Sequence, residues 1–154
     1  MTSFQLMKLL SGRPSSPFSQ RRNYLVIPNV SWGFLSYEAD MLVVTKARYA
    51  TEVEVKISMS DWKKDFEKRK HKIPDKRIKY QYYACPMKLA LRHTELDLPM
   101  GWGVIGVEDR QIKILKQAIA GDARKLRDKE VLILARLVCF RIWKVEAEEV
   151  VCSS

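Results

Sequence analysis

Charged and apolar residues alternate over residues 52–57, which read EVEVKI. A strand turns alternate side chains to opposite faces, so Glu52, Glu54 and Lys56 would share one face and the valines the other. The pattern therefore predicts a strand that holds two carboxylates and one ammonium group close together. An ordinary half-solvated strand, whose polar side chains simply meet water, is the alternative interpretation.

A second strand-like run, YEADMLVVT over residues 37–45, precedes this strand and carries Asp40. Only the polar segment 46–48 lies between the two runs. A connection of this length favours an antiparallel hairpin. The hairpin would bring Asp40 beside Glu54, so the sequence predicts two carboxylates converging from neighbouring strands.

Other patterns predict helices and strands on either side of the hairpin. Residues 61–72 are rich in helix formers, Ser58 supplies N-cap chemistry, and Pro74 stops the helix. Further expected elements are a helix over 4–10, strands over 24–27, 80–86, 103–108 and 111–115, and an apolar helix over 124–145 packed on the sheet. This order predicts an α/β fold with a mixed central β-sheet flanked by helices.

Length and composition favour one principal domain. The chain has 154 residues, 47% of them hydrophobic, which is enough for a substantial core. We expect a single domain over 23–147, preceded by a helix and a mobile surface connection within 1–22 and followed by a short tail at 148–154. The sequence leaves the oligomeric state open, a homodimer included.

The charge of the chain favours an anionic partner. Its formal net charge is +10, so nucleic acid comes first, with an acidic protein or an anionic membrane surface second. A cationic run follows the strand of residues 52–57. The side chains expected to contact DNA phosphates are Lys63, Lys64, Lys68, Lys70, His71 and Lys72, although a solvated helix face is the usual explanation for such a run.

The cysteines and the apolar runs indicate a cytoplasmic protein without a membrane partner. Cys85, Cys139 and Cys152 are widely spaced and form no zinc-binding or disulfide pattern. No signal peptide opens the chain, and the most apolar run, 131–140, is too short for a membrane span. The sequence also lacks a glycine-rich phosphate loop and a nucleophile elbow.

The converging carboxylates predict a site for a divalent cation. Asp40 and Glu54, with Lys56 nearby, can hold Mg²⁺ or Mn²⁺ against a phosphodiester and position an attacking water. Supporting candidates are Glu38 and Glu52 on the same strands and Gln81 on the strand over 80–86. His71 is a further candidate as proton donor, whereas Asp65 is expected to pair with Lys68 or Arg69 on the helix surface.

The order Asp40, then Glu54-Val55-Lys56 on the next strand, then a helix, resembles the core of the PD-(D/E)XK nuclease superfamily. The longer string EVEVKISMSDWKKDFEKRKH and the later LPMGWGVIGVED resemble its small single-domain branch of MmcB-like DNA-repair proteins and phage-encoded proteins. The similarity spans residues 37–143. It implies a restriction-endonuclease-like sandwich in which a mixed sheet lies between helices.

The resemblance also implies a metal-dependent nuclease acting on DNA, in repair or phage DNA processing. It implies that Asp40 and Glu54 bind Mg²⁺ or Mn²⁺, that the Val55 carbonyl adds a ligand, and that Lys56 orients the attacking water. Many members carry an acidic residue on the first helix, but here no acid precedes Glu38. Because the superfamily also contains members that bind nucleic acid without cutting it, a non-catalytic DNA-binding module is the alternative.

Overall fold

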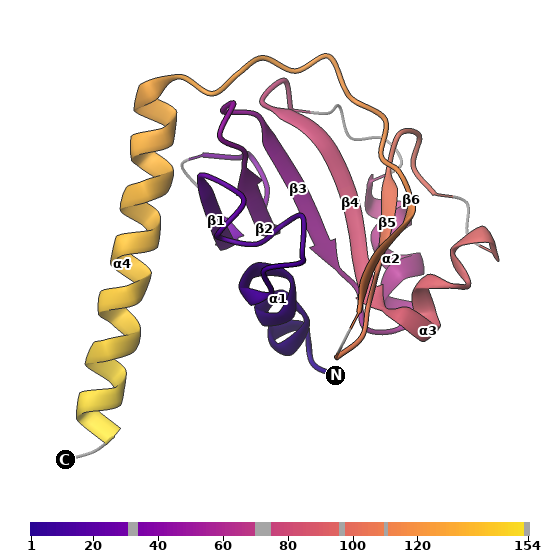
Figure 1. The fold of residues 1–154 in the computed structure, drawn as a ribbon, viewed down its shortest axis with the longest axis horizontal. Coiled ribbons are helices and arrows are strands. Elements are labelled where there is room, and N and C mark those ends of the chain that lie inside the picture. Colours follow the sequence, from indigo (N-terminus) through magenta and orange to yellow (C-terminus); the bar gives the residue numbers. More distant parts are fainter. Residues whose placement is uncertain (31–33, 70–74, 96–97, 110, 153–154) are drawn as a thin grey trace.

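A six-stranded mixed sheet forms the centre of the computed structural model (Figure 1). The structure describes residues 1–30, 34–69, 75–95, 98–109 and 111–152, with the backbone alone for 66–69 and 142–152. The strands are β1 (Leu25–Val30), β2 (Ala39–Val44), β3 (Ala50–Val55), β4 (Ile78–Pro86), β5 (Gly103–Val107) and β6 (Ile112–Lys116). The helices are α1 (Ser3–Gly12), α2 (Met59–Arg69), α3 (Met87–Ala90) and α4 (Asp128–Cys152), with a 3₁₀ turn at His93–Glu95.

The strands lie in the sheet in chain order, and their directions follow from their connections. β1, β2 and β3 pair as an antiparallel meander, and β5 and β6 pair antiparallel. The connection through α2 makes β4 parallel to β3, and the connection through α3 makes β5 parallel to β4. The predicted α/β fold with a mixed central sheet flanked by helices is therefore confirmed.

Helices cover both faces of the sheet. On one face, Leu6 and Leu10 of α1 pack against a cluster that includes Val53 and Val55. Two clusters lie on the other face, because alternate side chains of each strand point there. One contains Leu126, which lies just before α4, and Leu134 of α4, and the other contains Trp62 of α2 and Ala90 of α3.

The connection after α1 packs into the core, so the expectation that it lies on the surface is wrong for its middle. Phe18 is buried and meets the ring of Tyr82 edge to face at 5.5 Å. Ser16 and Ser19 beside it are also buried, and the Asn23 amide donates hydrogen bonds to backbone carbonyls of this segment. One aromatic residue thus anchors a stretch whose composition is otherwise typical of surface loops.

The last helix begins later than predicted and covers little of the sheet. Residues 124–127 run as an extended segment in which the Leu126 N–H donates to the Arg48 carbonyl at 2.8 Å. Along α4, Leu134 is buried, but Leu132 and Phe140 are 69% and 59% exposed. Figure 1 shows α4 standing beside β1 and extending past the sheet. Among the described residues, none of the helices combines the length and apolar content needed to cross a bilayer.

An ion pair fastens the first turn of α4. The Arg124 guanidinium donates to both oxygens of Glu130 at 2.6 and 2.8 Å, and the Arg127 N–H donates at 2.7 Å. The Arg124 hydrogen bonds, followed by that from Arg127, lower the pKa of Glu130 to about 2. Because this pKa is depressed on folding, the stability it contributes is present above the ordinary pKa of 4.5 and is lost as the pH falls toward 2.

We therefore expect Glu130→Gln to lower the free energy of unfolding by about 1 kcal/mol at pH 7, a value discounted for solvent screening of the exposed Arg124. The difference from wild type should shrink between pH 4.5 and pH 2. Urea unfolding at pH 7 and at pH 2.5 measures both quantities, and Glu108→Gln, which removes an exposed carboxylate elsewhere, is the control. A deficit that is the same at both pH values would contradict the expectation.

Candidate functional site

The charged side chains of β3 are buried in the sheet. Glu52 is 0% exposed, Glu54 is 3% exposed, and Lys56, which directly follows the strand, is 7% exposed. Glu52 pairs with Gln81 of β4, and Glu54 pairs with Tyr83. The alternation placed these three side chains correctly on one face, but they do not meet water as an ordinary half-solvated strand would.

Asp40 reaches the same end of β3 from the neighbouring strand. The register between β2 and β3 pairs Met41 with Val53, as the predicted hairpin requires. The Asp40 side chain is half-buried, and its Oδ2 accepts a hydrogen bond from the Val55 N–H at 2.8 Å. This hydrogen bond holds the Asp40 carboxylate against the backbone segment that carries Glu54 and Lys56.

Lys56 is held between two carboxylates. Its Nζ lies 3.6 Å from Oε2 of Glu54 and 3.3 Å from Oδ1 of Asp65. The Tyr83 hydroxyl donates to the other oxygen of Asp65 at 3.0 Å. The ammonium group therefore has a defined position, because its partners come from two different elements of the fold.

Asp65 is the site residue that the sequence interpretation missed. The expected pairing of Asp65 with Lys68 or Arg69 stays a prediction, because those two side chains lie outside the described part of the structure. α2 turns Asp65 toward the sheet, where it contacts Lys56. A signal was present, since Asp65 follows Trp62 by three residues and Trp62 is buried on the same face of the helix.

Neutral donors hold Glu52. The Tyr37 hydroxyl donates to its Oε2 at 2.9 Å, and the Gln81 amide donates to the same oxygen at 2.7 Å. Such hydrogen bonds satisfy a buried carboxylate and fix its position beside Glu54. Glu38 is exposed just before β2, and no contact in the described part of the chain joins it to Glu54. Of the two supporting carboxylates, Glu52 is therefore buried and hydrogen-bonded, whereas Glu38 is exposed.

Apolar and aromatic groups surround this polar cluster. Trp62 of α2 packs on Tyr83 with ring centroids 5.3 Å apart, and Tyr83 packs on Trp102 at 4.5 Å. On the other side, Glu52 lies opposite Leu42 of the cluster beneath α4. Charges in surroundings of low polarity interact more strongly than they do in water. The setting therefore strengthens the pairing of Lys56.

Two of the six basic residues predicted to contact DNA have side chains in the described part of the structure. Lys63 and Lys64 are exposed on α2. The Lys68 side chain, together with Lys70, His71 and Lys72, lies outside the residues that the structure describes. The helix that carries Asp65 thus also presents at least two exposed lysines.

The oxygen donors at this end of β3 are of the kind that Mg²⁺ and Mn²⁺ bind. Mg²⁺ usually takes one or two protein carboxylates and retains several waters, and Asp40, Glu54 and the Val55 carbonyl offer such a set. The described part of the chain contains no group of three or more histidine, cysteine or acidic side chains arranged for a metal. A larger cage, such as zinc or calcium sites use, is therefore not seen in those residues.

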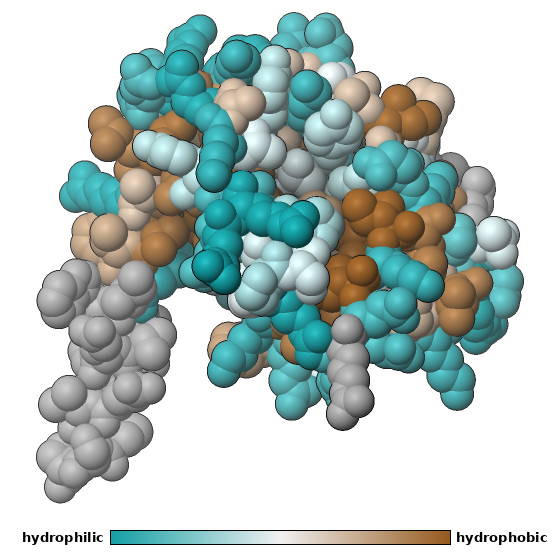
Figure 2. Space-filling model, in the orientation of Figure 1, coloured by the Kyte–Doolittle hydropathy of each residue, from teal (hydrophilic) through white to brown (hydrophobic). Residues whose placement is uncertain are grey.

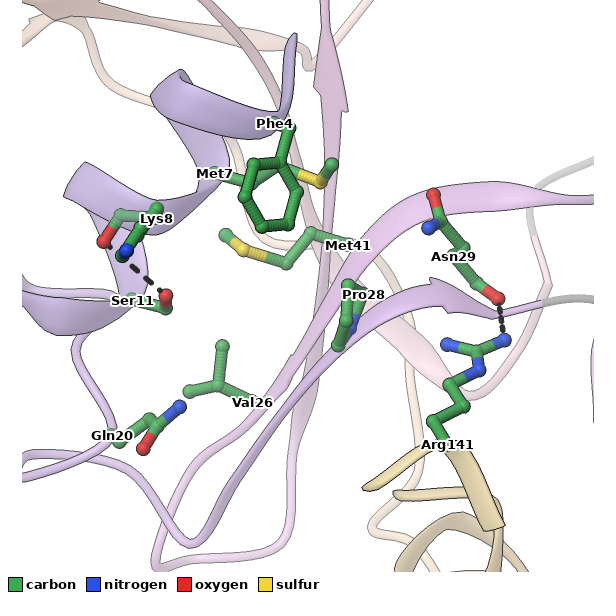
Figure 3. Close-up of a pocket in the computed structure, with 10 residues that line it drawn as sticks. All are labelled: Phe4, Met7, Lys8, Ser11, Gln20, Val26, Pro28, Asn29, Met41 and Arg141. Carbon is green, nitrogen blue, oxygen red and sulfur yellow. Dashed lines mark hydrogen bonds between the residues drawn. The ribbon is translucent and has the colours of Figure 1, made fainter. Parts of the chain in front are cut away.

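An apolar pocket lies on the other face of the sheet and is separate from this cluster. It has a volume of about 520 Å³ between α1 and β1. Figure 3 shows Phe4 and Met41 at its wall and the Arg141 side chain donating to the Asn29 carbonyl at its rim. Met41 belongs to the cluster under α1, on the face opposite Glu54. The pocket therefore does not contribute to the candidate site.

Comparisons with known proteins bear on the fold alone. No protein-family model and no curated protein matches the chain. A solved structure of a protein of unknown function from Silicibacter pomeroyi is similar to it, with 16% sequence identity and a TM-score of 0.55. The alignment covers 81% of this chain and 79% of that one, so the likeness extends over most of the α/β fold.

Proposed function

We propose that this protein is a metal-dependent nuclease that hydrolyses phosphodiester bonds in DNA. The observation that carries the proposal is the meeting of Asp40, Glu54 and Lys56, which the Asp40 hydrogen bond to Val55 and the Lys56 ion pairs hold at one end of β3. The resemblance of these residues to the PD-(D/E)XK pattern supports the same conclusion. The net charge of +10 suits a polyanionic substrate.

Each side chain has a role that follows from its position. Asp40, Glu54 and the Val55 carbonyl would hold Mg²⁺ or Mn²⁺, which when bound would supply Lewis acidity and offset charge that develops on the phosphate. Lys56 would orient the attacking water through its ammonium group. Asp65 and Tyr83 position Lys56, because Tyr83 holds the carboxylate that the ammonium group contacts.

A DNA-binding module without cleavage activity is the second candidate, and the burial of the site favours it. Lys56 is engaged by both Glu54 and Asp65, and the side chains of β3 are almost fully enclosed. Cleavage would require a phosphodiester to reach these groups. Binding through the positive surface has no such requirement, because phosphate contacts need only exposed cations.

Metal-dependent cleavage tests the two candidates directly. The purified protein is incubated with linear, circular and branched DNA in Mg²⁺, in Mn²⁺ and in EDTA. We expect strand cleavage only with a divalent cation, and its loss in the Lys56→Ala variant. Cleavage that survives this substitution would indicate a contaminating nuclease. Salt-sensitive binding without cleavage in either metal would favour the non-catalytic module, and the absence of DNA binding at low salt would contradict both candidates.

A further inference from the structure

A second charged region lies at the opposite end of the central strands. Three hydrogen bonds place the segment 117–127 across the start of β4 and the turn between β2 and β3. The N–H groups of Gly121, Arg124 and Leu126 donate to the carbonyls of Lys79, Lys76 and Arg48 at 2.8, 2.9 and 2.8 Å. The segment thereby gathers basic side chains from three parts of the sequence, which we call the basic rim: Lys46, Arg48, Lys76, Arg77, Lys79, Arg124, Lys125, Arg127 and Lys129.

The basic rim carries a large excess of positive charge. The same stretches of sequence hold four acids, Asp75, Asp122, Asp128 and Glu130. The nine basic side chains therefore leave a net charge of +5, half of the chain's +10. The acids that form ion pairs here do so with arginines: Asp75 pairs with Arg77, and Glu130 pairs with Arg124. Within the described residues, no ion pair joins a rim lysine to an acid. Figure 2 shows hydrophilic side chains crowding this upper edge of the molecule.

Tyr49 holds two of these lysines in place. Lys79 Nζ lies 3.7 Å from the centre of the Tyr49 ring, and Lys125 Nζ lies 5.7 Å from it. Cation–π contacts of this kind orient an ammonium group without neutralising it. Arg48, directly before Tyr49, has a φ of 65°, which completes the tight turn that presents the ring. Lys79 and Lys125 therefore lose less conformational freedom on binding an anion than scattered surface lysines would.

We infer that the basic rim binds the phosphate backbone of DNA. The inference takes DNA as the partner from the proposed function, but it does not require cleavage. An acidic protein is a poorer fit, because protein interfaces centre on clusters of buried apolar or aromatic anchors, whereas Ile119 is the one large exposed apolar side chain within the segment 117–127. Phosphate contacts need only positioned cations and backbone donors.

The rim is separate from the candidate catalytic site. Lys56 donates its N–H to the Ala84 carbonyl at the far end of β4, five residues beyond Lys79. At about 3.3 Å per residue, the two ends are roughly 17 Å apart. Duplex DNA covers that distance in about five base pairs, counting one charge on each strand per 3.4 Å. Contacts at the rim would thus engage DNA beside the segment that reaches Asp40.

Anisotropy with a labelled 20-base-pair duplex in EDTA tests the rim without any cleavage. The rim variant replaces Lys76, Lys79 and Lys125 with Gln. The control variant makes the same change of charge at Lys88, Lys113 and Lys116, which are exposed elsewhere. Titrations between 50 and 300 mM salt give the Kd and its salt dependence, and circular dichroism reports folding. A single Lys76→Glu variant, which leaves the Tyr49 contacts intact, serves if the triple variant does not fold.

We expect the rim variant to bind at least about 10-fold more weakly at 100 mM salt, with the slope of log Kd against log salt reduced by about 3. The control variant should change the slope by less than 1. Replacing the same three rim lysines with Arg should preserve binding. Equal weakening in the rim and control variants, an unchanged slope in the rim variant, or equally tight binding of polyglutamate would overturn the inference.

Discussion

Glu54→Gln is expected to lower metal-dependent DNA cleavage by about 100-fold or more. Glu54 of β3 and Asp40 of β2 are the two carboxylates proposed to bind the metal, which when bound would supply several kcal/mol of transition-state stabilisation that depends on its ligands. Binding of DNA in EDTA should be unchanged, because this side chain is buried and does not meet the solvent-exposed surface. Cleavage rates at saturating Mg²⁺ or Mn²⁺ measure the effect.

Glu38→Gln is the matched control for this prediction. It removes an exposed carboxylate immediately before β2, where no described contact joins it to Glu54. We expect it to retain wild-type cleavage within about threefold, the range of ordinary surface changes. If Glu38→Gln reduced cleavage as strongly as Glu54→Gln, then Glu38 would belong to the site. If neither variant reduced it, the assignment of Glu54 as a metal ligand would be wrong.

Lys56→Met is expected to lower the free energy of unfolding by about 3 kcal/mol. The substitution keeps an unbranched apolar stem but removes the ammonium group that lies between Glu54 and Asp65. Removing one partner of a buried ion pair typically costs about 3 to 5 kcal/mol, because the remaining charge loses its compensation in surroundings that solvate it poorly. Urea unfolding at pH 7 measures the change.

Two further variants make this result specific. Lys64→Met changes an exposed lysine on the same connection after β3 and should cost less than about 0.5 kcal/mol. The double variant Glu54→Gln/Lys56→Met should recover part of the loss, since it removes one of the two carboxylates that had faced the ammonium group. A Lys56→Met variant as stable as Lys64→Met would show that these ion pairs contribute nothing measurable to stability.

Local patterns predicted those features that depend on neighbouring residues. The charged face of β3 followed from alternation, because side chains of a strand point to opposite sides at every step. Ser58 marked the start of α2, and its Oγ accepts the Asp61 N–H at 3.2 Å. The hairpin between β2 and β3 followed from the short polar turn, which sets the register that brings Asp40 toward Glu54.

Patterns of the same kind were misleading where a side chain meets a distant partner. Phe18 lies in a stretch rich in serine and proline, yet it packs against Tyr82, which comes sixty-four residues later. The apolar middle of α4 predicted that this helix packs on the sheet, whereas Leu132 and Phe140 remain exposed. Composition shows how apolar a segment is, but the surface against which that segment can pack depends on where the preceding segment places it in the fold.

The amino-acid sequence alone determined the fold class, the two faces of β3 and the convergence of Asp40 with Glu54, because these depend on periodicity and on one short turn. Only the tertiary structure decided that Asp65 faces Lys56, that Glu52 and Glu54 are enclosed, and that the basic rim assembles around Tyr49. The Lys56–Asp65 pair spans only nine residues, but the hydrogen bond of Tyr83 to Asp65, that of Gln81 to Glu52 and the contact of Lys125 with Tyr49 join elements across a helical crossover or a long connection. Their packing depends on the whole chain, which no local pattern records.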